Sequence, residues 1–346
     1  MKVLIATVQV PFLRGGAELL TEGLHAALRR SGHQVDTLAL PFRFSPLGEV
    51  VQSMRAWQQQ DWSQWDAGRA DRLIALRFPA FHVQHPDKRV WLLHQHRAIY
   101  ELWNTPFGES ADHPPTEAWR DEVMAADTRA LKEARAVYTI ARNVSRRLER
   151  YNQVPSRALY HPPFEAERFH HEGVYPFILC PSRLESLKRQ DLLIRAMVHV
   201  PEPVTAYIVG EGGMQDSYRA LAQSLGVEQR IHFLGHTGHE HLRKLYANCL
   251  AVFFGPHDED YGYITLEAML SSKPVITCTD SGGPLEFVLH DQTGLIVPPE
   301  AQALASAISE LAANPDRARR MGRDARAHYE ALDIRWEHVV DTLMKD

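Results

Sequence analysis

The sequence has no long apolar run, few cysteines and no excess of positive charge. Its 346 residues contain no stretch of about eighteen consecutive apolar residues, which argues against a membrane-spanning helix. The net charge of -5 gives no reason to expect nucleic acid as a partner. The three cysteines, Cys180, Cys249 and Cys278, form no CxxC pair and lie in apolar runs. We therefore expect buried thiols without a disulfide framework, and a cytoplasmic location.

Two further signals are missing, a dinucleotide fingerprint and a metal-ligand set. No G-x-G-x-x-G follows any predicted strand, which counts against a dinucleotide enzyme. His94 and His96 share one face of a strand but have no third ligand at a recognisable spacing. The histidines at 232, 236, 239 and 241 are spaced equally loosely. We expect no metal.

The most informative stretch is residues 253–277, FFGPHDEDYGYITLEAMLSSKPVIT. Apolar runs flank an acidic loop and a short helical segment, which predicts strand, loop, helix and strand in that order. We expect the helix to begin near Ile264–Thr265 and to hold Glu267 in its first turn. A helix start offers unpaired N–H groups to a phosphate. Glu259 and Glu267 would instead bind neutral hydroxyls, as a sugar or ribose presents.

This stretch resembles the signature of the retaining glycosyltransferases of family 4, which have the GT-B fold. The resemblance rests on Glu259-x7-Glu267, with Gly262 between them and Ala268-Met269 after. It implies that Glu259 contacts the donor sugar and Glu267 the ribose of the nucleotide. Residues between them are expected to line the donor site: Tyr261, Gly262, Tyr263, Ile264 and Thr265. An acidic surface loop before an ordinary helix is the alternative interpretation.

A second motif lies on the strand–helix loop after residues 177–180. Arg183 and Lys188 occur there five positions apart, and two such cations suit a diphosphate. The family has an Arg and a Lys at this spacing, which bind the donor pyrophosphate. Arg189 stands where relatives often have glycine. Two surface cations without a ligand remain the alternative.

Three glycine turns complete the predicted donor site in the second half. Gly210 follows one predicted strand, and Gly235 with His236 follows the next. In relatives the latter turn frames the nucleobase through backbone groups. The loop 280–284, DSGGP, resembles the family's loop over the sugar phosphate, and Glu286 is expected to open a helix.

The first half opens as a doubly wound α/β domain. A strand over residues 2–8, a loop with Gly15 and Gly16, a helix to about Ser31 and a strand over 35–40 follow one another. The resemblance places Gly15 and Gly16 near the donor phosphates, although a plain tight turn explains them equally well. The strand over 89–93 ends at His94, where the family often has a histidine close to the reacting sugar. His94 is therefore predicted to be catalytic together with Glu259, Arg183 and Lys188.

Two segments of the first half keep more than one interpretation. Three interpretations stay open for the tryptophans at 57, 62 and 65: part of the core, a platform for the acceptor, or an interface. The helix over 143–151 follows Arg142 and contains Arg146, Arg147 and Arg150. We favour a solvated face for it over a patch that contacts an anionic membrane.

The predicted architecture is α/β, with two Rossmann-like domains of the GT-B fold facing across a cleft. Residues 1–165 form the acceptor side, 166–330 bind the nucleotide sugar, and 331–346 form a closing helix that returns to the first domain. The predicted function is transfer of a hexose from a UDP- or GDP-sugar to a hydroxyl of a glycan, polysaccharide or lipid-linked acceptor, with retention and without a cofactor. A sugar-nucleotide epimerase, a phosphorylase of GT-B shape and a two-domain binding protein without chemistry are the alternatives.

Overall fold

A computed structural model describes residues 1–12, 14–63, 69–108 and 117–345. It divides into two compact units, Met1–Phe164 with Arg335–Asp346, and Glu165–Ile334. Of the residues discussed above, Trp65 lies outside the described part of the chain. Each unit is built on one six-stranded sheet, and all the paired strands in both sheets run parallel.

The sheet of the first unit has the strand order β2-β1-β3-β4-β5-β6. Its strands are β1 (Lys2–Gln9), β2 (Gln34–Pro41), β3 (Arg72–Ala75), β4 (Lys88–Leu92), β5 (Ala136–Thr139) and β6 (Arg157–Ala158). The middle of β1, from Val3 to Val8, is buried throughout, as its uninterrupted apolar run predicts for a strand covered on both faces.

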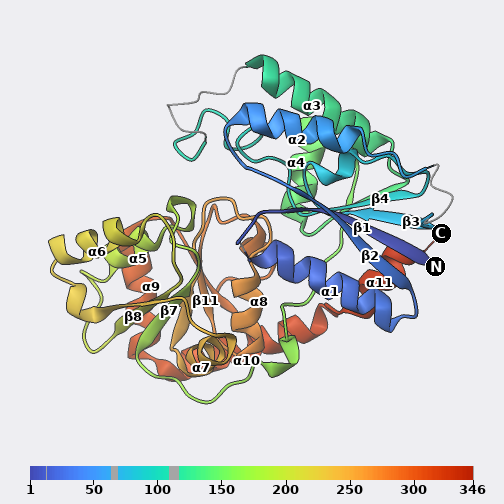
Figure 1. Ribbon diagram of the computed structural model, residues 1–346. Helices are drawn as coiled ribbons and strands as arrows, with labels where there is room; N and C mark the ends of the chain where they lie inside the picture. The colour runs from blue at the N-terminus through green and yellow to red at the C-terminus, as the bar shows by residue number, and fades with distance from the viewer. Residues whose placement is uncertain (13, 64–68, 109–116, 346) are drawn as a thin grey trace. The chain divides into compact units, whose positions relative to one another are not determined.

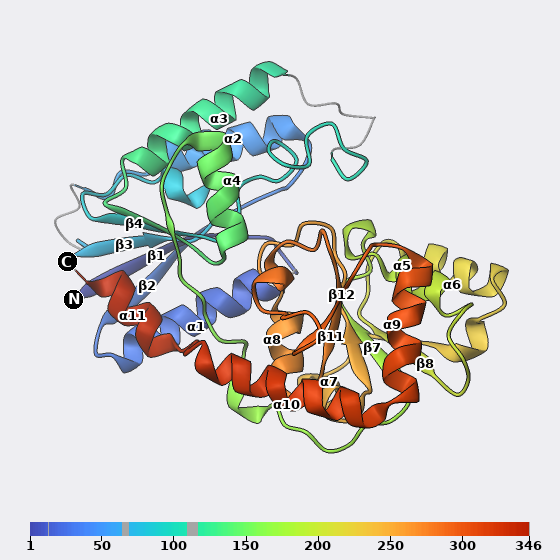
Figure 2. The ribbon, with the colours of Figure 1, turned by 180° about the vertical axis from the view of Figure 1, so that it is seen from behind.

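Helices cover both faces of this first sheet (Figures 1 and 2). α1 (Gly16–Arg30) and α11 (Trp336–Met344) pack together on one face. α2 (Leu47–Gln58), α3 (Glu117–Lys132) and α4 (Arg142–Asn152) cover the other. Trp57 in α2 is fully buried, so it belongs to the core.

Helix α4 corrects one prediction. Three of its arginines, Arg142, Arg146 and Arg150, are exposed as expected for a solvated face. Arg147 is buried instead, and its guanidinium lies 3.0 Å from the carboxylate of Glu101. A 3.6-residue period places Arg147 about 100° around the helix from Arg146, on the side that also holds the buried Asn143 and Val144.

The sheet of the second unit has the order β12-β11-β10-β7-β8-β9. Its strands are β7 (Phe177–Pro181), β8 (Thr205–Val209), β9 (Ile231–Gly235), β10 (Ala251–Phe253), β11 (Val275–Cys278) and β12 (Gly294–Val297). Its helices are α5 (Gln190–Ala196), α6 (Gln215–Ser224), α7 (His239–Asn248), α8 (Tyr263–Leu270), α9 (Ala301–Ala313) and α10 (Pro315–Ala331). α5 packs against α6 and α9, and α8 packs against α10 (Figure 1).

Two elements of the second unit differ from the sequence prediction. The segment with His239 and His241, considered only as a loose histidine group, is helix α7, whose buried side includes Tyr246. Glu286 does not open a helix, because it is the last residue of a 3-10 turn, Gly283–Glu286.

The three cysteines are free and buried, as predicted. Burial raises the pKa of the Cys180 and Cys249 thiols to about 12 and that of Cys278 to about 11. The thiols are therefore protonated at neutral pH and pack as small apolar groups. Within the described residues, none of the helices is long and apolar enough to cross a membrane.

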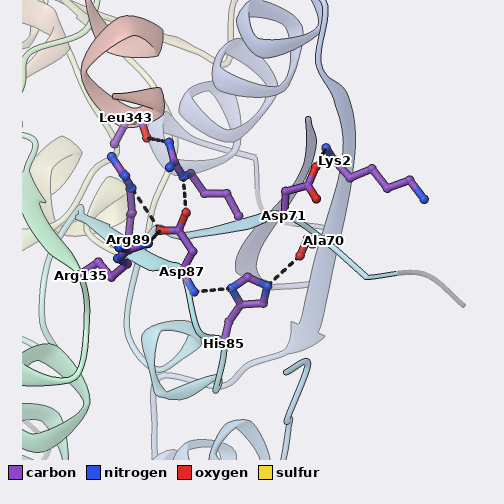
Figure 3. Close-up of polar contacts among 9 residues, drawn as sticks. Lys2, Ala70, Asp71, His85, Asp87, Arg89, Arg135 and Leu343 are labelled. Atoms are coloured by element: carbon purple, nitrogen blue, oxygen red, sulfur yellow. Dashed lines mark hydrogen bonds and ion pairs between the residues drawn. The ribbon is translucent and has the colours of Figure 1, made fainter. Parts of the chain in front are cut away.

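A buried ion-pair cluster fixes the C-terminal helix at the amino end of the first sheet (Figure 3). Arg72 on β3 is almost fully buried, and its Nε donates to Asp87 Oδ2 at 2.8 Å. Its Nη1 also donates to the carbonyl of Leu343 in α11 at 3.2 Å. Arg89 Nε lies 3.4 Å from the second oxygen of Asp87. Asp87 thus holds the arginine that binds the last turn of α11.

Asp87→Asn is expected to lower the free energy of unfolding by about 3 kcal/mol, because Arg72 then stays buried without its carboxylate partner. Burial alone would raise the pKa of Asp87, but the bonds and charges of Arg72 and Arg89 bring it below the ordinary value. This stabilisation is therefore present at neutral pH and is lost as the pH falls below about 4. Urea unfolding at pH 7 and pH 3 measures both effects.

Asp71→Asn is the matched control. Asp71 lies in the same region and accepts from the backbone N–H of Lys2 at 2.7 Å, but this bond is exposed (Figure 3). We expect a change within about 0.5 kcal/mol. Equal losses from the two variants would contradict the role given to Asp87.

Candidate functional site

The loops after β7 and β10 emerge on either side of the point where the strand order of the second sheet reverses. β7 pairs with β8 on one side and with β10 on the other. The chain therefore adds β8 and β9 in one direction from β7, and β10, β11 and β12 in the other. In open parallel sheets, ligands bind beside the carboxyl ends of the strands at such a reversal. The first of these loops carries Arg183 and Lys188, and the second carries Glu259.

Backbone and side-chain bonds fix the loop with the two cations. The N–H of Ser182 donates to Val209 O at 2.8 Å, and that of Leu184 donates to Glu211 O at 2.9 Å. The buried Gln190 donates from Nε2 to Arg183 O at 2.9 Å. The backbone of this loop is therefore held before any ligand binds.

The loop with Glu259 runs beside the glycine loop that follows β11. The N–H of Glu259 donates to Ser281 O at 2.9 Å, and Glu259 O accepts from Gly283 N at 2.8 Å. One residue earlier, Asp258 N donates to Asp280 O at 2.9 Å. This short parallel pairing sets the direction of the Glu259 side chain.

Lys188 and Glu259 meet at the centre of this region. Lys188 Nζ donates to Glu259 Oε2 at 2.5 Å, and the two side chains are only 15% and 17% exposed. The ammonium also lies 5.8 Å from the ring centroid of Phe254. The structure thus places a cation from one predicted motif against a carboxylate from the other, 71 positions apart in the chain. The Arg183 guanidinium is more exposed and pairs with Glu185 at 2.8 Å.

Helix α8 begins at Tyr263 after Gly262, which has a φ of +87°. A left-handed conformation and close neighbours in Phe254 and Pro284 explain the glycine at this position. Since the helix begins at Tyr263, Glu267 lies in its second turn, and the expectation of a first-turn position is wrong. Tyr263 and Ile264 are half-buried, whereas Thr265 and Tyr261 are buried. Tyr261 packs edge-on against Tyr263, with ring centroids 5.4 Å apart.

Glu267 is oriented by a tyrosine that the sequence analysis did not single out. Tyr246 of α7 donates its hydroxyl proton to Glu267 Oε2 at 2.7 Å. Burial raises the pKa of Glu267, and the bond from Tyr246 lowers it in part. The apolar spacing of Leu242, Leu245 and Tyr246 was the available signal for this helix.

The glycine turns after β8 and β9 lie next to each other. Gly210 N donates to Gly235 O at 2.9 Å, and both glycines have positive φ, +134° and +64°. His236 presents its backbone N–H 3.4 Å from a carboxylate oxygen of Glu211. A ligand base at this edge would therefore meet backbone groups and one carboxylate.

In the first unit, Gly15 and Gly16 begin helix α1. The N–H of Gly15 donates to Glu18 Oε2 at 2.9 Å, and Arg77 donates to the other oxygen of Glu18 at 2.9 Å. Glu18 thus ties the loop after β1 to that after β3, where the order of this sheet reverses. Glu18 thus makes the carboxylate half of a capping box, but Gly15 has no side chain to complete it, so the usual S/T-x-x-E signature is absent from the sequence.

His94 follows β4 and is half-buried, and its Nδ1 lies 2.7 Å from Gln95 O. The adjacent Gln95 is buried and donates to Asn152 of α4. Gly15, Gly16 and His94 belong to the first unit, and the other predicted site residues belong to the second. In the described part of the chain, no three His, Cys, Asp or Glu side chains are grouped so that they could hold a metal.

The fold is similar to that of solved structures over nearly the whole chain. A sucrose-phosphate synthase from Thermosynechococcus elongatus aligns with a TM-score of 0.77 at 19% identity, over 99% of this chain and 97% of that one. Anabaena HepE, solved in complex with UDP-glucose, aligns with a TM-score of 0.71 at 20% identity, over 99% and 98%. WaaG, a glycosyltransferase involved in lipopolysaccharide biosynthesis, gives 0.67 at 15% identity over 100% of both chains. The fold is GT-B, which confirms the prediction.

Residues 164–328 match the family model described as glycosyl transferases group 1. A D-inositol 3-phosphate glycosyltransferase of Gordonia bronchialis is 31% identical over 186 residues, which cover 50% of this chain and 39% of that protein. A GDP-mannose-dependent alpha-(1-6)-phosphatidylinositol monomannoside mannosyltransferase of Mycobacterium tuberculosis is 33% identical over 182 residues, 49% of this chain and 47% of that one. The chain thus spans less than half the length of these curated relatives. Over residues 164–328 the chain is thus similar to the group 1 glycosyl transferases, as the motifs in this half predicted.

The close approach at Gly210 gives a test of how the cation loop is held. A Cβ on Gly210 would lie 2.1 Å from Ser182 O, whereas a Cβ on Gly213 would meet nothing within 4 Å. Gly210→Ala is therefore expected to lower the free energy of unfolding by at least about 2 kcal/mol. Gly213→Ala, the control, should leave it nearly unchanged. Denaturant unfolding measures both, and equal midpoints would refute the packing described here.

Proposed function

We propose that the chain is a retaining glycosyltransferase that moves a hexose from a nucleoside-diphosphate sugar to a hydroxyl group of an acceptor. The observation that carries this proposal is the Lys188–Glu259 contact of 2.5 Å beside the strand reversal. A diphosphate needs a cation and a sugar needs hydrogen-bond acceptors, so this pair suits the junction between them. The glycosyl transferases group 1 match over residues 164–328 supports the same reaction.

The proposed donor is a UDP- or GDP-sugar. Two relatives support this range, because one is named for GDP-mannose and the other was solved with UDP-glucose. In our proposal Arg183 and Lys188 bind the diphosphate, Glu259 the sugar and Glu267 the ribose. The backbone at Gly210, Gly235 and His236 frames the base. The start of α8 adds a partial positive charge for a phosphate.

The proposed reaction needs charge stabilisation and orientation more than a protein nucleophile. The bond between the anomeric carbon and the diphosphate oxygen breaks, and a bond to the acceptor oxygen forms on the same face of the sugar. The acceptor proton passes to the leaving phosphate, which departs as the nucleoside diphosphate. Lys188 and Arg183 stabilise the charge that grows on this leaving group. We therefore propose that no metal is required, and that Gly15, Gly16 and His94 act from the first unit.

For the acceptor we propose a hydroxyl-bearing glycan, polysaccharide or lipid-linked sugar. The exposed Arg142, Arg146 and Arg150 of α4 motivate a peripheral contact with anionic lipid. Sedimentation with vesicles that contain phosphatidylserine tests this contact. Binding that does not weaken when all three arginines are replaced by glutamine would reject it.

The test of the reaction is incubation with a panel of UDP-, GDP- and ADP-sugars, with and without simple glycan acceptors, in buffers with excess EDTA or with Mg²⁺. We expect one donor to release nucleoside diphosphate and to give a glycosylated product at the same rate in both buffers. Donor isomerisation without transfer would identify an epimerase instead. Binding without any turnover would identify a ligand-binding protein.

Removal of either cation should lower the rate of the chemical step. Because the charge on the diphosphate grows as the sugar bond breaks, Lys188→Ala should lower kcat by about 10²-fold, the scale for one preorganised charge-stabilising group. Arg183→Ala should act in the same direction. The double variant should lose less than the product of the two effects, since both groups act on one ligand. Steady-state kinetics with the donor from the panel measures these values.

Arg146→Ala is the control with a soluble acceptor, since this arginine is exposed on α4 of the first unit. It should keep the kcat of the unmodified protein. Unchanged kcat and donor KM in folded Lys188→Ala and Arg183→Ala would place the diphosphate site elsewhere.

A further inference from the structure

Arg189 occupies a backbone position that favours glycine. Its φ is +54°, in the left-handed region that side chains with a Cβ rarely adopt. It lies between Lys188 and Gln190, the first residue of α5. A side chain with a Cβ therefore carries a conformational cost at this position.

The Arg189 guanidinium is held by a two-point ion pair. Its Nη1 donates to Asp280 Oδ1 at 2.8 Å and its Nη2 donates to Asp280 Oδ2 at 2.6 Å. Nη2 also lies 2.8 Å from Nδ1 of His257. The Arg189 side chain is 15% exposed and that of Asp280 is 37% exposed, so the arginine is shielded from water and the carboxylate is only half-buried. Bidentate pairs of this kind fix orientation as well as charge.

These contacts join the three loops that carry the proposed donor site. Arg189 belongs to the loop with Arg183 and Lys188, His257 to the loop with Glu259, and Asp280 to the glycine loop after β11. A backbone bond from His257 N to Leu187 O at 2.8 Å reinforces the first of these junctions. The bond from Asp258 N to Asp280 O likewise joins the loop with Glu259 to the glycine loop after β11.

We infer that Arg189 is a positioning residue, which locks the three donor loops together through Asp280 and His257. This inference rests on the proposed function, because the loops it joins are those assigned to the donor. Arg189 fixes the distance between Lys188 and Glu259 before the nucleotide sugar binds. Such preorganisation lowers the cost of ordering the loops on binding and in the transition state.

The first experiment needs no ligand. Arg189→Gly removes the bonds to Asp280 but also relieves the left-handed strain, and because these effects oppose each other the melting temperature should change little. Amide hydrogen exchange should nevertheless become faster in residues 183–189, 257–259 and 280–283 and stay unchanged in the first unit. Arg195→Ala is the matched control, because Arg195 also faces an aspartate, Asp191 at 3.9 Å, from the neighbouring helix α5. Unchanged exchange in Arg189→Gly would overturn the inference whether or not the protein is a transferase.

The second experiment measures binding of UDP and GDP by calorimetry, and kcat with the donor from the panel. Arg189→Gly and Asp280→Asn should each raise the Kd and lower kcat by about 10- to 100-fold, as expected for displaced reacting groups. The double variant should be no worse than either single one, and Arg189→Lys should restore part of the loss. Arg189→Lys also serves as the second variant if the glycine variant is poorly folded.

Two results would overturn the positioning role. If Asp280→Asn is as active as the unmodified protein while Arg189→Gly is impaired, Arg189 contacts the ligand directly. If both variants bind and turn over normally, the ion pair has no part in the site. Failure of the unmodified protein to bind either nucleotide would count against the proposed function, and the exchange experiment would still decide the role of Arg189.

Discussion

The parallel pairing of β7 with both β8 and β10 is the constraint on which the arrangement of loops in the second unit depends. Since the strands share one direction, the loops that follow them emerge at one edge of the sheet. Because the winding reverses between β7 and β10, the helices that follow these two strands lie on opposite faces of the sheet. This leaves space for the loops after β7 and β10 to approach each other. Lys188 and Glu259 come within hydrogen-bond distance for this reason, although they are far apart in sequence.

Much of this architecture follows from local sequence patterns. Continuous apolar runs identified β1 and β7 because strands buried on both faces need no polar alternation. Arg183, Lys188 and Glu259 were identifiable because each lies on a loop that follows a strand, whereas Glu267 was identifiable by its spacing from Glu259. The family and the GT-B fold could therefore be predicted from residues 177–299 and a thinner signal before them. The assignments of individual residues to donor and acceptor remain proposals.

The errors and omissions concern interactions between segments distant in the chain. Glu267 was placed in the first turn because the start of α8 was expected one or two residues too late, and this start depends on the left-handed Gly262. Arg147 was counted with its exposed neighbours because its partner, Glu101, lies on another segment. The Tyr246–Glu267 and Arg189–Asp280 bonds leave no trace in spacing or composition. Tertiary packing decides such contacts, and one sequence alone does not encode them in a readable pattern.

The distribution of the cysteines has a practical consequence. All three lie in the second unit, two of them on strands of its sheet and one just before β10, and all three are buried. Alkylating reagents react with the thiolate of an accessible cysteine, so labelling requires this unit to open. The rate of labelling would thus report the opening of the second unit alone, and the first unit, which has no cysteine, would not react. The cysteines of the native chain therefore serve as a probe of unfolding in one of its two units.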